Sequence, residues 1–528
     1  MRIDYGKVVE PKSFHYDLCI IGAGVAGIIC AAEASKKFTS KKIVLIESGD
    51  FGLNSTHNYS LKKLQHSQLP ITQNSREFTV GGTSSTWGGV TSHFEEFEIK
   101  DRKNFGHNDW PIRYDELVKY YKMASLKYGF ANTLGSEVNA GNFFEDFHKR
   151  KFLAHPEPIN YKKYLPSEVD LIFNAHVKTM RSNQDLVERI DIVQCERKVV
   201  SSVYAQKFIL SAGGIETIKL LLNSLKRDEL QVGKERALIG KFFMNHPKNE
   251  YGEIHLSTTV DFSPYVGNFK KGLYQYTGIS LPRQIQINEK LLNHYVRFEP
   301  ILPWKNDKWV GWVITFLSNK KAMLKLFFRL YKNKEVQLLD FSETGDEEHL
   351  SNLKSDGKLK SFMLVLKYLY YRLTNKRPNV TKLKIRNYQE MEPRFENCIE
   401  LTDQQDTIGN FQVKVNHQLS QREKDTMYKL HHMINQYLKE NQLGKLNAEL
   451  TTKDGQWAIS SDAAHHMGGT IMGSEPENSV VNSELRMHSL KNVYIASSSV
   501  FPTSGSQNPT YTIGALACML IDKMEFDA

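Results

Sequence analysis

Apolar and polar residues alternate along the chain in patterns that predict strands and helices near both ends. Close to the N-terminus, the apolar run from Tyr16 to Ile21 predicts a buried strand, and the stretch from Ile28 to Ser35 predicts a helix. Lys42 to Ile46 predicts a second strand, which is followed by Glu47. At the opposite end, the apolar run from Ile513 to Ile521 follows the sequence NPTYT and predicts a buried helix.

The region between these ends contains further strand patterns of two kinds. The first kind predicts an antiparallel hairpin unit that returns to the main sheet, at Leu171 to Met180, Val187 to Glu196 and Val199 to Leu210, with a helix to follow from Ile218 to Leu225. The second kind predicts strands of another sheet, at Glu250 to Ser257 and Lys382 to Gln389, and Gln412 to Asn416 predicts a further short strand. Arg422 to Asn441 predicts a helix, while the polar residues 135–165 predict an irregular lid or linker.

A glycine-rich fingerprint lies directly after the first predicted strand. It has glycines at Gly22, Gly24 and Gly27 and leads into the predicted helix, and Glu47 lies 20 residues after the last of them. Such glycines allow a pyrophosphate to approach the helix N-terminus closely, and the carboxylate accepts hydrogen bonds from ribose hydroxyls. A glycine turn of some other α/β unit is the weaker interpretation, because strand, helix and acid are all in register. The motif predicts a dinucleotide site without separating FAD from NAD.

Three further segments contain candidate functional residues, although none of them identifies a function by itself. Residues 81–89 read GGTSSTWGG and predict an irregular loop with many N–H and hydroxyl donors, in which Trp87 favours burial against a flat group. Residues 211–217 read SAGGIET and predict the end of a strand of the same parallel sheet, followed by a helix. Near the C-terminus, His466 and Asn508 each lie beside glycine or proline, where backbone can approach a ligand closely.

Taken in order, five blocks resemble the glucose–methanol–choline (GMC) oxidoreductases, which depend on FAD. The blocks are GAGVAG with Glu47, GGTSSTWGG, SAGGIET, HHMGGT and SSVFPTSGSQNPTYTIGALA. They are most similar to the branch that includes pyranose oxidase and the sugar-acid dehydrogenases, and residues 300–380 fall outside the resemblance. The resemblance implies an α/β fold with a Rossmann-like FAD-binding domain built from discontinuous segments, plus an α+β substrate domain with an antiparallel sheet.

The same resemblance implies an activity, the transfer of a hydride from an alcohol carbon to flavin N5. The hydroxyl proton must leave in the same reaction, and a neutral histidine is its natural acceptor near physiological pH. A second hydrogen-bonding side chain holds the hydroxyl in place. The motif H-x-x-G-T matches at His466 as this base, and Asn508 occupies the partner position. His465 is the rival for the base, while His246, which precedes a proline, is interpreted as a satisfied loop histidine.

The expected cofactor is non-covalent FAD. Some relatives attach FAD to a histidine of the GGTSSTWGG region, but no histidine lies between Gly81 and Thr91, and His93 is out of register. No metal is expected, since the five cysteines are scattered without C-x-x-C spacing. The expected FAD contacts are Gly22, Gly24, Gly27, Glu47, Gly81, Gly82, Thr83, Ser84, Trp87, Gly88, Gly89, Val177, Ala212, Gly213, Ser498, Pro509 and Thr510. The expected substrate is a sugar or other alcohol, and the electron acceptor stays open between oxygen, a quinone, a cytochrome and a carrier protein.

The chain has a net charge of +10 and a pI of about 9.0, but its basicity is local. Lys320 to Lys334 and Lys358 to Arg377 each hold six basic residues and no acid, and the rest of the chain has a net charge of −2. No nucleic-acid-binding motif accompanies them, so a nucleic-acid partner is not expected. Both segments form basic and apolar helical stripes. They predict either a helical pair packed on the substrate domain or an anchor on an anionic membrane surface.

These patterns predict a domain division and a location. FAD-binding segments are expected at residues 1–115, 166–250 and 456–528, a lid or linker at 116–165, and a substrate domain at 251–455 with a basic helical insertion at 318–378. The first 20 residues lack the apolar region of a secretory signal, and no uncharged apolar run reaches the ~18 residues of a membrane span. We therefore expect a cytoplasmic protein, and the anchor interpretation of the basic segments would place it at the inner membrane surface as a peripheral protein. A nicotinamide-dependent dehydrogenase and a basic flavoprotein that mainly binds a membrane are the alternatives.

Overall fold

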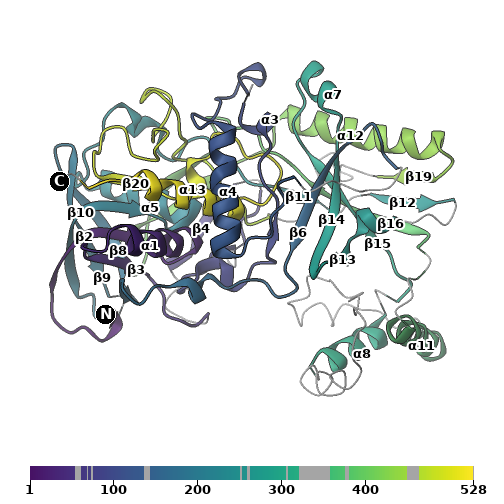
Figure 1. The fold of residues 1–528 in the computed structure, drawn as a ribbon, viewed down its shortest axis with the longest axis horizontal. Coiled ribbons are helices and arrows are strands. Elements are labelled where there is room, and N and C mark those ends of the chain that lie inside the picture. The colour runs from purple at the N-terminus through teal and green to yellow at the C-terminus, as the bar shows by residue number, and fades with distance from the viewer. Residues whose placement is uncertain are drawn as a thin grey trace.

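The computed structural model describes residues 1–526 apart from 54–60, 68, 73–74, 101, 136–142, 195, 250–251, 258–261, 305–306, 320–356, 375–377, 379 and 449–462. The described chain forms two large sheets, which lie to the left and the right in Figure 1. A small third sheet consists of β17 (Cys398–Gln405), β18 (Phe411–Asn416) and β4 (Leu64–His66). Short 3-10 helices occur at Tyr5–Lys7, Gly82–Ser85, Arg102–Phe105, Tyr161–Tyr164, Lys234–Leu238 and Ser498–Val500.

The first sheet assembles parallel strands from widely separated parts of the chain. Its order is β1-β7-β3-β2-β10-β9-β8, and β20 also pairs with β10. The strands are β1 (Arg2–Asp4), β2 (Ser13–Ile21), β3 (Ile43–Ile46), β7 (Asp170–Phe173), β8 (His176–Asn183), β9 (Leu186–Val193), β10 (Val200–Leu210) and β20 (Val493–Ile495). All pairs are parallel except β10 with β9 and β9 with β8. This arrangement confirms the Rossmann-like domain built from discontinuous segments, although its exact domain boundaries stay a prediction.

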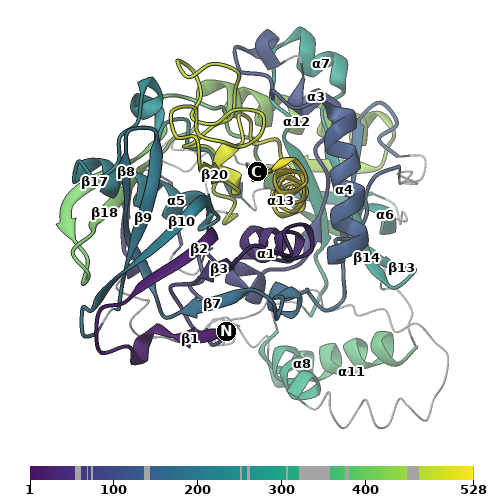
Figure 2. The ribbon, with the colours of Figure 1, turned by 60° about the vertical axis from the view of Figure 1, so that its left-hand side comes forward.

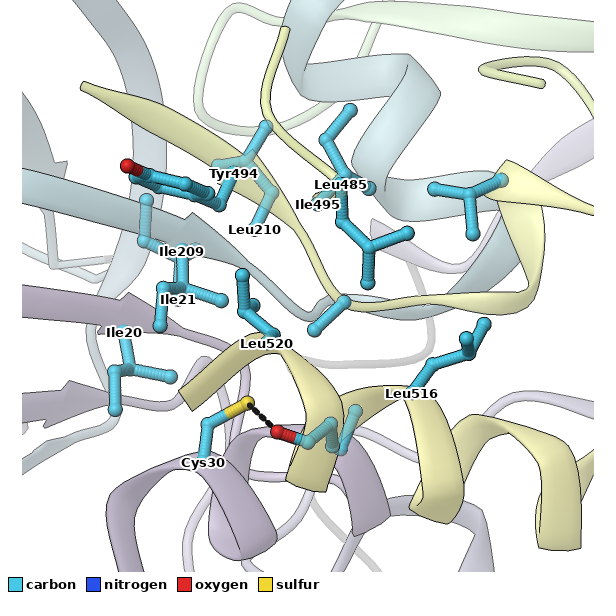
Figure 3. Close-up of a cluster of buried hydrophobic side chains, with 14 of the residues drawn as sticks. Ile20, Ile21, Cys30, Ile209, Leu210, Leu485, Tyr494, Ile495, Leu516 and Leu520 are labelled. Atoms are coloured by element: carbon cyan, nitrogen blue, oxygen red, sulfur yellow. Dashed lines mark hydrogen bonds between the residues drawn. The ribbon is translucent and has the colours of Figure 1, made fainter. Parts of the chain in front are cut away.

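Apolar helices pack against this sheet. Figure 3 shows the core where side chains of β2, β10 and β20 meet α13 (Thr510–Lys523), and where Cys30 Sγ of α1 (Val25–Lys37) lies 3.9 Å from the carbonyl oxygen of Ala517. Helix α13 also packs against α4 (Tyr114–Tyr128). It begins three residues earlier than the predicted Ile513, and α5 (Gly213–Lys226) begins five residues earlier than the predicted Ile218. Both helix N-termini therefore lie directly at the glycine and asparagine motifs.

The prediction of one strand from Leu171 to Met180 was wrong. The segment is split into β7 and β8, which lie in different parts of the same sheet. Asn174 adopts a left-handed φ of 55°, which ends β7 in a turn. In this turn the N–H of Ala175 donates to the carbonyl oxygen of Glu47 at 3.0 Å. The antiparallel unit predicted downstream is present as β8, β9 and β10.

The second sheet has nine strands, and every pair is antiparallel. Its order is β19-β12-β16-β15-β14-β6-β5, with β11 beside β16 and β13 beside β14. The strands are β5 (Val90–Thr91), β6 (His148–Ala154), β11 (Lys248–Asn249), β12 (Glu253–Leu256), β13 (Asn268–Lys270), β14 (Leu273–Ser280), β15 (Tyr295–Pro300), β16 (Lys382–Tyr388) and β19 (Gly444–Asn447). The second, antiparallel sheet is thus confirmed. The irregular structure predicted for residues 135–165 was wrong over β6, which pairs with β14 and β5.

Helix α12 (Gln421–Glu440) covers one face of the second sheet. Leu430, Ile434 and Leu438 share an apolar core with strand residues such as Val296 and Phe298. The spacing of the helix residues puts them on one side of the helix, as the sequence predicted. The opposite face carries an aromatic cluster. Short helices α3 (Glu96–Ile99), α6 (Ser263–Val266) and α7 (Arg283–Asn288) complete this half of the molecule.

Helices α8 (Lys308–Asn319) and α11 (Lys358–Thr374) pack against each other, apart from both large sheets in Figures 1 and 2. The first basic segment, residues 320–334, lies outside the described residues, whereas α11 covers most of the second. Among the described residues, no helix combines the length and apolar character required to cross a bilayer.

Candidate active site

A cavity of about 420 Å³ lies where the parallel strands end against the second sheet, a volume typical of cofactor sites. Ile21, Ile46 and Ala496 line it from the ends of β2, β3 and β20. Tyr276 and Tyr388 line it from β14 and β16 of the second sheet. Ligands of α/β folds bind outside the carboxyl ends of parallel strands, so this is the expected position for a dinucleotide.

Most of the residues selected from the sequence meet at this cavity. Gly27 and Gly81 do not line it and lie behind it. Those that line it are Gly22, Gly24, Glu47, Gly82, Thr83, Ser84, Trp87, Gly88, Gly89, Val177, Ala212, Gly213, His466, Ser498, Asn508, Pro509 and Thr510. Residues from all five sequence blocks are therefore brought to one site.

The glycines leave room for a ligand. A Cβ atom added at Gly24, Gly88 or Gly213 would meet no atom within 4 Å, and all three residues line the cavity. A Cβ atom on Gly82 would lie 2.8 Å from the Cα atom of Gly24, so the two glycine loops touch. Gly27 serves packing, since its Cβ atom would lie 1.9 Å from the carbonyl oxygen of Gly22. These bare backbone surfaces fit a dinucleotide that approaches the main chain closely.

Glu47 lies at the end of β3 and is buried. Its carboxylate accepts hydrogen bonds from the N–H of Ala23 at 2.8 Å and of Gly49 at 2.9 Å. Burial raises the pKa of Glu47 to about 7, although these N–H groups and that of Ser48 oppose the shift. An acceptor fixed at this strand end fits the ribose hydroxyls of the cofactor.

Several charged residues at the cavity were missed by sequence reasoning. Arg76 and Glu216 form an ion pair and both line the cavity. Lys219 also lines it and pairs with buried Asp406 at 2.9 Å. The two residues of each ion pair lie 140 and 187 residues apart in the sequence, so no short-range motif could have predicted these pairs.

At the cavity, two histidines and an amide are linked by side-chain contacts. Asn508 Nδ2 lies 3.0 Å from Nε2 of His465, whose Nδ1 lies 2.8 Å from Nδ1 of His246. His246 Nε2 lies 2.9 Å from the carbonyl oxygen of Gly505 and 3.2 Å from that of Ser504. His246 is satisfied, as predicted, yet it also supports a cavity residue. The contact between His246 and His465 joins positions 219 residues apart, so a sequence motif could not have predicted it.

The partners determine where the protons lie in this chain of contacts. Burial lowers the pKa of His246 to about 4, and burial followed by the nearby His246, Lys248 and His466 holds the pKa of His465 well below 6.5. Both rings are therefore neutral at physiological pH. Two carbonyl acceptors require a proton on Nε2 of His246, so its Nδ1 accepts the N–H of His465 Nδ1. Nε2 of His465 then carries a lone pair, which accepts the amide N–H of Asn508.

His466 is buried beside this chain of contacts and lines the cavity. Its ring stacks on Phe243 with centroids 6.2 Å apart, and its carbonyl oxygen accepts the hydroxyl of Ser498 at 2.6 Å. A Cβ atom on Gly214 would lie 2.3 Å from that same carbonyl oxygen. The backbone of His466 is thus held between the start of α5 and the segment that follows β20.

The fold and the cavity define a class of protein in which a Rossmann-like parallel sheet faces an antiparallel sheet across a cavity lined by glycine motifs. Residues 393–517 match the family model described as GMC oxidoreductase. The matched segment contains the last two of the five sequence blocks, so the C-terminal part of the chain is similar to this family, as those blocks indicated.

Individual similar proteins share either a low sequence identity over the whole chain or a higher identity over a short segment. A formate oxidase of Aspergillus oryzae RIB40 has a TM-score of 0.55 at 14% identity, with 98% of each chain covered. Pyridoxine 4-oxidase from Mesorbium loti has a TM-score of 0.54 at 12% identity, covering 96% of this chain and 98% of the other. These likenesses concern the fold. The fructose dehydrogenase large subunit of Gluconobacter japonicus is 41% identical over 58 residues, which is 11% of either chain, so the match spans only a small part of that relative.

Proposed function

We propose that the protein oxidises a CH–OH group of a sugar-like or polyol substrate to a carbonyl. The observation that carries this proposal is the meeting of His466 and Asn508 at a cavity that the glycine cradle for a dinucleotide also lines. The cradle of Gly24, Gly88 and Gly213 would hold FAD, with Glu47 at its ribose. When bound, FAD accepts the hydride from the alcohol carbon.

His466 is the proposed base that takes the hydroxyl proton. His465 is less suited, because its pKa is held well below 6.5 and its Nε2 lone pair already accepts from Asn508. We assign His465 a positioning role. It holds one N–H of Asn508, so the second N–H and the amide oxygen stay available to fix the substrate hydroxyl. Proton and hydride then leave the same alcohol, and a carbonyl remains.

The test is an anaerobic panel of sugars, polyols and simple alcohols, with flavin absorbance as the signal. At least one alcohol should bleach the flavin of the wild-type protein, while the His466→Ala variant should keep its yellow colour and resist bleaching. Reduction by dithionite is the control that each flavin is competent. If dithionite bleaches the flavin but no alcohol of the panel does, the proposal is wrong.

A second proposed function is attachment to the inner, anionic membrane surface through α11. One face of this helix packs on α8, around buried Tyr368. The outward face exposes six large apolar side chains at helical spacing, between 46% and 79% exposed, namely Leu359, Phe362, Met363, Leu366, Tyr370 and Leu373. Ordinary packing on the substrate domain does not account for this exposed stripe.

Charge supports a lipid surface as the partner. Lys358, Lys360 and Lys367 are exposed on α11, and the helix contains no acidic residue. Each basic residue near an anionic bilayer contributes ~1 kcal/mol, and apolar side chains add burial at the acyl boundary. The geometry therefore suits a peripheral, reversible attachment.

Sedimentation with lipid vesicles tests this attachment. The full chain should pellet with vesicles that contain phosphatidylglycerol, remain in the supernatant with phosphatidylcholine alone, and dissociate in high salt. Phe362→Asp should abolish pelleting, whereas Leu126→Asp, at an 88% exposed site on α4, should not. If the wild-type protein stays in the supernatant with anionic vesicles at low salt, the proposed attachment is wrong. The attachment is also wrong if Phe362→Asp changes a dimer into a monomer in gel filtration but does not change pelleting with vesicles.

A further inference from the structure

The wall of the cavity formed by the second sheet is both basic and aromatic. Lys248 on β11, Tyr276 on β14, Arg297 on β15 and Tyr388 on β16 all line the cavity. Side chains alternate along a strand, so the neighbours of Arg297 on β15 turn instead into the apolar core beneath α12. The register of the four strands puts these residues on one face of the sheet, and that face lies toward the cavity.

Arg297 is buried yet incompletely bonded. Only 9% of the residue is exposed, and its Nε has no hydrogen-bond partner within the described part of the chain. Its guanidinium lies 4.3 Å from the centre of the Tyr276 ring, and Nη2 donates to the hydroxyl of Tyr274 at 2.9 Å. A rigidly held guanidinium at a cavity wall suits an anionic acceptor that a ligand supplies.

Negative charge around this wall is scarce. The Glu299 carboxylate lies 3.8 Å from Arg297 and 3.1 Å from Arg386, so two guanidinium groups share it. Lys248 adds another cation close to His465. The carboxylates that line the cavity are engaged elsewhere, by backbone N–H groups or by their own cations, at Glu47, Glu77 and Glu216.

The tyrosine rings give the wall a flat and rigid surface. Tyr276 stacks on Phe152 with centroids 4.8 Å apart and planes at 7°. Tyr388 stacks on Tyr295 with centroids 4.6 Å apart and planes at 4°. Such a surface suits the C–H face of a sugar ring or a short carbon chain, while the cations beside it suit an anion.

We propose that the substrate is a sugar-like alcohol with an anionic group, a carboxylate or a phosphate, which Lys248 and Arg297 bind. This inference rests on the proposed alcohol oxidation, because it names the substrate class for the same cavity. Arginine forms paired hydrogen bonds with both kinds of anion, so the anionic charge is the shared recognition element.

Calorimetric binding to the FAD-loaded protein tests the charge preference without requiring turnover. The probes are two matched sets, glucose with gluconate and glucose 6-phosphate, and glycerol with glycerate and glycerol 3-phosphate. An anionic member should bind about tenfold or more tightly than its neutral counterpart, and this advantage should shrink with salt. The tighter of the two anions identifies the group. Equal binding of neutral and anionic members, or no binding of any anion in the sets, overturns the proposal.

Two variants with the same loss of charge localise the effect. Arg297→Gln should remove most of the anion preference and leave FAD content intact. Arg386→Gln, which loses a cation at the same Glu299 but does not line the cavity, should keep the preference. Lys248→Gln serves as the second cavity variant if Arg297→Gln does not fold. Loss of the preference in Arg386→Gln to the same degree, or its survival in both cavity variants, contradicts the site.

The two proposals can fail separately. If the anions bind through Arg297 but no alcohol bleaches the flavin, the anion site stands and the oxidation fails. If neutral alcohols bleach the flavin as well as their anionic counterparts, the oxidation stands and the anion site fails.

Discussion

The side-chain amide of Asn508 donates to Nε2 of His465 across 3.0 Å. This contact gives the amide one orientation, because the opposite side of the same imidazole is engaged by His246 at 2.8 Å. An amide held in this way can position a substrate hydroxyl without first reorganising. The first prediction follows from the proposed roles of the two neighbouring histidines, His466 as the base and His465 as the residue that positions Asn508.

His466→Ala should lower the rate of flavin reduction by ~10²–10⁴-fold while FAD stays bound, because a general base acts on the substrate and not on the cofactor. His465→Ala and Asn508→Ala should each cause a smaller loss, since water can replace part of a positioning contact. Single-turnover reduction followed by stopped-flow absorbance measures all three variants. A His466→Ala variant that reduces flavin at the wild-type rate, beside an inactive His465→Ala variant, would assign the base to His465.

Two glycine-to-alanine changes in the fingerprint should fail in different ways. At Gly27 the new methyl group would lie 1.9 Å from the carbonyl oxygen of Gly22, so the helix must shift and the denaturation midpoint should fall. At Gly24 it would enter open cavity space, so the fold should survive and FAD content should drop. Urea titration and the ratio of flavin to protein absorbance report the two effects. An alanine at Gly27 that leaves the midpoint unchanged contradicts this packing role.

FAD should be released by acid precipitation, with the yellow colour in the supernatant. The GGTSSTWGG loop offers no histidine for attachment, and His93 does not line the cavity. Its Nδ1 instead lies 2.7 Å from the hydroxyl oxygen of Thr133. Flavin that stays with the pellet of the wild-type protein but not with that of His93→Ala would show attachment at this residue and refute the prediction.

The stability of the fold should fall as the pH is lowered from about 6.5 toward about 4. Burial lowers the pKa to about 4 in His176, His246 and His431 and to about 3 in His294, from an ordinary value of 6.5. In this range the unfolded chain binds more protons, so acid favours unfolding. Glu47 acts in the opposite direction, since its pKa is raised to about 7, but it is outnumbered by these histidines and by His93, whose pKa burial also lowers to about 4.

Urea midpoints at pH 7.5 and pH 5 provide the measurement for this pH dependence, at conditions on the order of one unit on either side of the ordinary histidine pKa. His431→Gln removes one of the buried histidines far from the cofactor motifs, so its midpoint should fall less between the two conditions. A wild-type midpoint that is constant or rises on acidification contradicts the prediction.

The sequence by itself determined the glycine motifs, the acid after the second strand, and the asparagine and histidine near the C-terminus. These signals are local, because a turn at Gly22 or a helix start just after Asn508 depends on residues only a few positions away. Their spacing was sufficient to predict the dinucleotide fold from separate segments, and most of the selected residues line one cavity.

Only the tertiary structure decided what surrounds those motifs. The sequence pattern continued Leu171 to Met180 as one strand, because nothing local showed that Asn174 would turn the chain beside Glu47. The contact between His246 and His465, and the turning of Arg297 toward the cavity, join strands and loops from distant parts of the chain. Alternation tells which residues share a face of a strand, but the packing of the two sheets determines which face meets the ligand.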